Sequence, residues 1–150
     1  MTIEFATDAQ RITHQHVAAI LKEEYGRQAR TIDDQPVFVL PPHGSAIATV
    51  GVEAWGEDAS VVRVWSMVVL DAEQSPELHR FLLERNTQVL LGAFALQEDG
   101  GIVFQSTLIG EGMQPDHLLH AVRAVLFTAD AEDDSIVSRY GGRRMTDRTG

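Results

Sequence analysis

Cysteine is absent from the 150-residue sequence. Disulfide bonds, thiolate nucleophiles and cysteine-ligated zinc or iron–sulfur centres are therefore excluded together. Lysine is nearly absent as well, because Lys22 is the single lysine and every other basic residue is an arginine. Schiff-base chemistry thus has one candidate, which lies on a predicted solvated helix face.

Long apolar runs are also missing. The longest, such as residues 89–96, have the length of a strand and fall far short of the roughly 20 residues that a membrane-spanning helix needs. The opening "MTIEFATDAQ" contains no basic region followed by an apolar one, so it does not predict a secretory signal. These features predict a cytoplasmic protein with no membrane partner.

Positive charge is in deficit, with 22 acidic residues against 12 basic ones and a formal net charge of −10. A chain this acidic repels nucleic acid and anionic membrane surfaces and attracts basic segments of partners. We therefore expect no nucleic-acid partner. The length, with 44% hydrophobic and 23% charged residues, is typical of one globular domain.

Hydrophobic periodicity and turn residues predict alternating groups of helices and strands. The expected elements are helices over residues 13–25, 76–89 and 115–140, and strands over residues 27–32, 36–40, 46–55, 61–70, 90–96 and 102–109. Short polar turns join neighbouring strands, so the sheet is expected to be antiparallel. We predict an α+β domain over residues 1–142, in the order α-β-β-β-α-β-β-α, with five or six strands flanked by helices, followed by a disordered tail over residues 143–150.

Asn86 interrupts the apolar stripe of the second predicted helix, which includes Leu78, Leu82 and Val89. Two interpretations are open. Asn86 ends the helix, where asparagine tolerates a left-handed conformation and bonds unpaired carbonyls. Alternatively, it makes a polar contact with a dimer mate or another bound protein.

The strand over residues 61–70 is largely apolar on both faces, which is unusual for an antiparallel sheet covered on one side. Burying a side chain the size of Trp65 or Met67 contributes roughly 1.5–3 kcal/mol, and Trp, Met and Arg are enriched at interfaces. The candidate protein interface therefore comprises Arg63, Trp65, Met67 and Asn86. The alternative is that the first or last helix covers this face within one monomer.

The side chains that could catalyse a reaction or bind a metal ion do not make up a complete active site or metal site in the sequence. His117 and His120 share a helical face beside Asp116, but a metal site needs three or four converging ligands. The acidic run over residues 130–134 lacks the calcium-loop pattern and indicates a solvated helix face or a short helix break. No nucleophile, phosphate-binding or dinucleotide motif occurs. We predict no catalytic, cofactor-binding or metal-binding residue, and hence no enzyme.

One long segment resembles the YbjN-like family, which shares the fold of type III secretion chaperones. It is "LLERNTQVLLGAFALQEDGGIVFQSTLIGEGMQPDHLLHAVRAVLFTADAEDD", residues 82–134, with the asparagine that ends the middle helix, the "GAF" and "EDG" motifs and the final "TAD". The later "RYGG" of residues 139–142 also matches. Over the first half the resemblance is mainly topological, and in all it covers most of residues 12–142.

The resemblance implies an antiparallel sheet flanked by helices, and usually a homodimer. Members of the family are described as sensory transduction regulators or chaperone-like proteins with no settled catalytic activity. We therefore expect a non-catalytic, homodimeric protein that binds an unidentified protein partner. The alternative is a regulator that binds a small ligand, and a less favoured one is a metal-dependent enzyme that uses the histidines.

Overall fold

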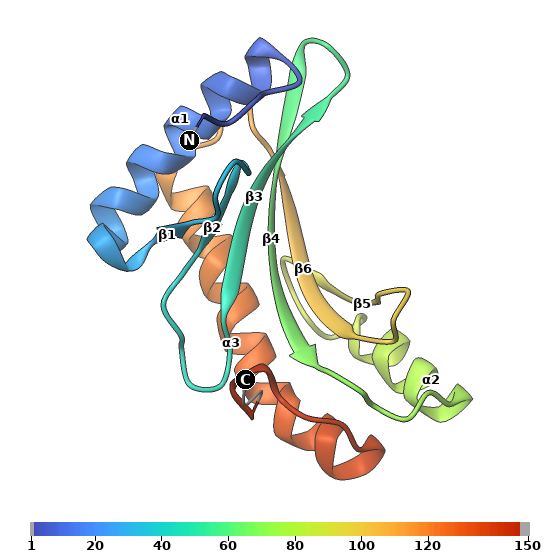
Figure 1. The fold of residues 1–150 in the computed structure, drawn as a ribbon. Helices are drawn as coiled ribbons and strands as arrows, with labels where there is room; N and C mark the ends of the chain where they lie inside the picture. Colours follow the sequence, from blue (N-terminus) through green and yellow to red (C-terminus); the bar gives the residue numbers. More distant parts are fainter. Residues whose placement is uncertain (1, 148–150) are drawn as a thin grey trace.

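The computed structural model describes residues 2–147 as three α-helices and one six-stranded antiparallel sheet (Figure 1). In chain order the elements are α1 (Asp8–Tyr25), the 3-10 turn η1 (Gly26–Gln28), β1 (Arg30–Thr31), β2 (Val37–Val39), β3 (Ala48–Trp55), β4 (Ala59–Val69), α2 (Pro76–Arg85), β5 (Ala93–Leu96), β6 (Ile102–Ile109), α3 (Pro115–Tyr140) and the 3-10 turn η2 (Met145–Asp147). The strands lie in the order β1-β2-β3-β4-β6-β5. The predicted α+β class and antiparallel sheet of five or six strands are confirmed, and the order of elements differs from α-β-β-β-α-β-β-α only by a fourth strand between α1 and α2.

The ends of two helices differ from the predicted ones. The first helix begins at Asp8 because the Thr7 hydroxyl caps it, accepting a bond of 3.1 Å from the Gln10 N–H. Thr13, the predicted cap, is buried inside the helix instead. The second helix ends at Arg85 rather than near Val89, although Ser75 and Pro76 open it as expected.

All three helices pack on the same face of the sheet, which we call the inner face. Figure 1 shows α3 (orange) running behind the strands and α2 (yellow-green) at the β5 end. Val62, Val64 and Val68 of β4 are fully buried there, in a core that also contains Leu21 of α1 and Val122 of α3. Val61, Arg63, Trp65 and Met67 of β4 point to the opposite, outer face and lie outside this core. The alternative, in which the first or last helix covers the face of Trp65 and Met67, is therefore wrong, because α1 and α3 both pack on the inner face.

A polar junction between buried Thr13, buried Ser60 and exposed Glu111 fixes α1 to the sheet and to the turn before α3. The Thr13 and Ser60 hydroxyls lie 2.6 Å apart. The Glu111 carboxylate accepts bonds from the Ser60 N–H at 2.9 Å and from the Ser60 hydroxyl at 2.5 Å. These bonds lower the pKa of Glu111. The junction links three segments that are far apart in the sequence.

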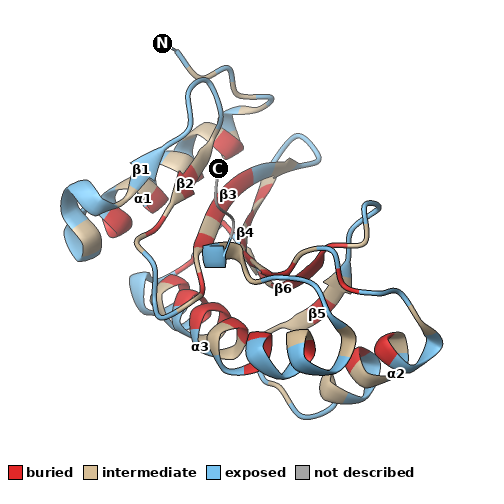
Figure 2. Ribbon diagram, turned by 60° about the horizontal axis from the view of Figure 1, so that its bottom comes forward, coloured by how far each residue is buried: buried red, intermediate tan, exposed pale blue. Residues whose placement is uncertain are grey.

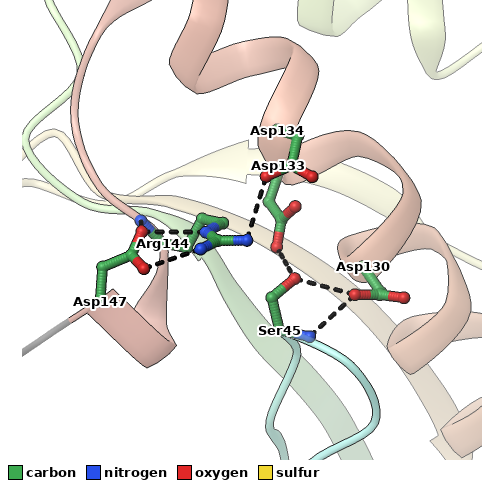
Figure 3. Close-up of polar contacts among 6 residues, drawn as sticks. All are labelled: Ser45, Asp130, Asp133, Asp134, Arg144 and Asp147. Carbon is green, nitrogen blue, oxygen red and sulfur yellow. Dashed lines mark hydrogen bonds and ion pairs between the residues drawn. The ribbon is translucent and has the colours of Figure 1, made fainter.

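A second polar cluster joins α3 to the loop before β3 (Figure 3). The Ser45 hydroxyl donates to Asp130 at 2.8 Å and also contacts Asp133, while the Ser45 N–H donates to Asp130 at 2.8 Å. Asp133 is 2% exposed, and this burial raises the pKa of its carboxyl. Glu132, 8% exposed, pairs with Arg85 of α2.

The prediction of a solvated helix face or a helix break over residues 130–134 is therefore wrong for Glu132 and Asp133. The helix α3 is continuous through them, and both side chains are buried. Their partners, Arg85 and Ser45, are at least 45 residues away along the chain, so the local run of carboxylates does not reveal them.

Part of the predicted disordered tail has defined contacts. Leu70 and Arg143 exchange two backbone hydrogen bonds of 2.8 Å, and Arg143 pairs with Asp71 at 2.9 Å. Gly142 makes this return possible, because its φ is 90° and a Cβ there would collide with the backbone of Leu70. Residues 148–150 of the predicted tail lie outside the described residues.

The Glu111 junction gives a pH-dependent contribution to stability. Because the folded state lowers the Glu111 pKa below its usual 4.5, the carboxylate stabilises the fold above that pH and loses its effect as the pH falls through the folded value. We expect Glu111→Gln to lower the free energy of unfolding at pH 7 by roughly 0.5–1 kcal/mol, after allowance for solvent screening. Urea titrations at several pH values measure this.

The control is Glu23→Gln, which removes a carboxylate from the exposed side of α1. The difference between Glu111→Gln and the unsubstituted chain is expected to shrink below pH 4.5, whereas Glu23→Gln shows little difference at any pH. Parallel stability curves for the two variants would contradict the assigned role of Glu111.

Candidate protein-binding surfaces

An aromatic side chain lies on the outer face against the neighbouring strand. Trp65 of β4 is half-buried and packs over Gly51 of β3, where a Cβ would stand only 3.1 Å from the indole ring. A glycine at this position therefore lets the ring contact the backbone of the neighbouring strand. Met67, two residues along the same strand, continues the apolar surface and is also half-buried.

Arg63 is held in place by groups on three strands. Its guanidinium donates to Glu53 of β3 at 3.3 Å and to Gln105 of β6 at 3.1 Å, and lies 5.8 Å from the centre of the Trp65 ring. The charge is thus partly neutralised, and the guanidinium stacks beside the indole. Structure and sequence agree that Arg63, Trp65 and Met67 share one face.

The apolar surface extends beyond these three residues. Val103 of β6, which pairs with Met67 of β4, is 4% exposed although it lies outside the helix-covered core. Trp55 and Ile109, at the other end of the face, are each 63% exposed. Figure 2 shows the exposed hairpin tips beyond the buried middle of the strands. The outer face therefore carries an apolar stripe along β4, formed by Val61, Trp65 and Met67 around Arg63.

Asn86 joins α2 to β5. Its side-chain oxygen accepts a bond of 2.7 Å from the Phe94 N–H, and its amide nitrogen donates to the Phe94 carbonyl at 3.2 Å. The side chain thus mimics a neighbouring strand. It does end the helix, but with a φ of −61°, so the expected left-handed conformation is wrong. As an interface residue Asn86 stays a prediction.

A second exposed apolar surface, the β5–α2 edge, lies at the end of the sheet. It is formed by Leu83, Leu90, Leu91 and Leu96, which are 43–81% exposed. The strand β5 pairs only with β6 within the described residues, so its other edge is open. Leu91 has a φ of 63°, a left-handed conformation that costs about 1–2 kcal/mol for a residue with a side chain.

Some of the histidines and carboxylates, including His16, Glu111 and His117, bond to groups of the chain itself. The His117 ring nitrogen Nδ1 accepts from the Gln114 N–H at 3.2 Å, which completes the cap of α3. In residues 2–147, no three His, Cys, Asp or Glu side chains are arranged to hold a metal ion. A hollow of about 400 Å³ beside α1 contains Thr13, His16 and Glu111, but each of these bonds to groups of the chain itself.

No helix within residues 2–147 has the length and hydropathy needed to cross a membrane.

Comparison with known proteins identifies the family of the chain. Residues 12–148 match the family model described as "T3SS (YopN, CesT) and YbjN peptide-binding chaperone 1". The chain belongs to this peptide-binding chaperone family. No curated protein matches it by sequence.

Solved structures agree with the chaperone fold. The chain is similar to one in the "Crystal Structure of the ExsC-ExsE Complex", with a TM-score of 0.64 and 16% identity over 82% of this chain and 95% of that one. It is also similar to one in the "Structure of the HopA1-SchA Chaperone-Effector Complex", with a TM-score of 0.62 and 12% identity over 82% and 97%. At these identities the likeness shows the fold alone.

The Asn86 geometry leads to a test with two substitutions. Asn86→Ala and Asn86→Gly each leave the Phe94 N–H and carbonyl without their partner, so we expect each to lower the free energy of unfolding by about 1–3 kcal/mol. Glycine should be no better than alanine because φ is −61°. Gln88→Ala, at an exposed neighbour, is the control and should change stability by less than about 0.5 kcal/mol. Full stability of Asn86→Gly would contradict this role.

Proposed function

We propose that this chaperone binds a segment of a partner polypeptide on its outer face, without catalysis. The observation that carries the proposal is the apolar stripe around Arg63, Trp65 and Met67, which none of the helices α1, α2 and α3 covers. Membership of a peptide-binding chaperone family supports it. One similar structure is titled as a chaperone–effector complex, which supports a protein partner here as well.

Binding of this kind needs an apolar surface that is already organised. Trp65 rests on Gly51, and Arg63 is fixed by Glu53 and Gln105, so little side-chain freedom is lost when a partner arrives. Covering the remaining exposed area of the stripe removes apolar surface from water at roughly 25 cal/mol per Å². The proposed compartment is the cytoplasm, where such a chaperone meets newly made polypeptides.

We also propose that the chaperone forms a homodimer through the β5–α2 edge. The exposed leucines there would be buried between two copies, and the open edge of β5 offers backbone groups for pairing. The left-handed conformation of Leu91 supports this, because an exposed side chain by itself gives no compensation for the strain. The outer face stays open in such a dimer.

The peptide-binding proposal is tested with a fluorescently labelled, reduced and carboxymethylated lactalbumin as an unfolded probe. Trp65→Ala combined with Met67→Ala should raise the Kd at least tenfold, which corresponds to about 1.4 kcal/mol. Phe127→Ala removes an exposed aromatic side chain from α3 and should leave the Kd unchanged. Equal Kd values for both variants, with unfolding curves unaltered, would overturn the proposal.

The homodimer is tested by sedimentation velocity at micromolar protein concentration. Leu83→Glu combined with Leu90→Glu places four carboxylates in the interface of a symmetric dimer, so we expect the population to shift to monomer. Ile12→Glu, at an exposed position on α1, is the control and should not change the dimer. A monomeric unsubstituted chain, or a dimer that survives the leucine substitutions, contradicts this interface.

A further inference from the structure

We propose that the outer face selects partner segments whose apolar side chains are flanked at both ends by lysine or arginine. This inference rests on the proposed peptide binding and adds the chemistry of the partner. It follows from the position of the carboxylates at the two ends of the apolar stripe.

Each end of the stripe carries exposed carboxylates. Glu57 and Asp58 form the tip of the β3–β4 hairpin, beyond Trp55 and Ile109. At the other end, Glu98 and Asp99 form the tip of the β5–β6 hairpin, and Gly101 of the same turn lies beside the Met67 sulfur.

These four carboxylates have no ion-pair partner within residues 2–147. Two arginines next to β4 are already engaged, because Arg63 pairs with Glu53, and Arg143, which bonds the Leu70 backbone, pairs with Asp71. In a chain with a net charge of −10, an arriving cation therefore finds unpaired acidic groups at both ends.

The strand sets the length of the segment that fits. From Val61 to Met67 the stripe follows six steps of a β-strand, which span about 20 Å. An extended segment of six or seven residues covers this length, as does a helix of about 13 residues. Basic residues just outside such a segment reach the two hairpin tips.

The same charges disfavour a second copy of this chain on the outer face. Both ends of the stripe are acidic, so two copies stacked face to face bring carboxylates together in either orientation. Nucleic acid and anionic membranes are repelled for the same reason. A polypeptide segment with basic ends contacts the apolar stripe with its apolar side chains and pairs with the carboxylates at both ends of the stripe.

The test uses three labelled peptides with one seven-residue core of alternating apolar and threonine residues. Their ends carry two lysines, two glutamines or two glutamates each, and binding to the intact protein is followed by fluorescence anisotropy. We expect the lysine-ended peptide to bind at least tenfold more tightly than the glutamine-ended one, and the glutamate-ended one most weakly. This order should weaken between 0.05 and 0.5 M salt, roughly the range over which exposed charges become screened.

Variants that each remove two carboxylates show which part of the protein causes the preference for lysine ends. Glu57→Gln with Asp58→Asn, and Glu98→Gln with Asp99→Asn, should each reduce the preference for lysine ends. Glu23→Gln with Glu24→Gln removes the same two charges from α1 and should preserve the preference. Loss of the preference in this control would mean that net charge alone attracts the peptides, which overturns the inference.

The remaining outcomes separate this inference from the proposed function. If all three peptides bind equally and Trp65→Ala abolishes binding, the peptide site stands and the inference about its ends fails. If Trp65→Ala changes none of the affinities, or no peptide binds, the peptide site itself fails. If sedimentation shows a dimer that depends on Trp65, the outer face is an interface between copies and the inference is overturned.

Discussion

The packing of all three helices on one face of the sheet is the constraint on which the rest of the structure depends. Burial of Val62, Val64 and Val68 against the helices supplies the single core. The same arrangement leaves the alternating residues of β4 without a helix over them. An antiparallel sheet normally carries polar residues on such a face, whereas this one carries Trp65 and Met67. The surplus of apolar surface is the physical basis of the proposed peptide binding.

Polar contacts between distant segments keep the helices in this arrangement. The Thr13, Ser60 and Glu111 junction fixes α1, and Ser45 fixes α3 through Asp130 and Asp133. Asn86 pairs with the backbone of β5 and holds α2. Each of these contacts lies on the helix side of the sheet or at its ends. These contacts between helices and sheet therefore do not use the side chains of the apolar stripe.

In the proposed binding mode, charge and apolar surface act together. The net charge of −10 is not spread evenly around the stripe, because Arg63 lies at its centre and carboxylates lie at its two ends. Apolar contact contributes most of the free energy of such binding, whereas long-range charge raises the rate of encounter and discriminates between partners. The proposed segment with basic ends gains from both apolar contact and the attraction of opposite charges.

The sequence by itself determined the α+β class, the order of elements and the apolar character of both faces of β4, because these follow from side chains two to four positions apart. It also placed Arg63, Trp65 and Met67 on one face. Only the tertiary structure decided which face the helices cover, how Asn86 pairs with Phe94, and that Glu132 and Asp133 are buried. These outcomes depend on partners far along the chain, such as Arg85 and Ser45, and no local pattern carries that information.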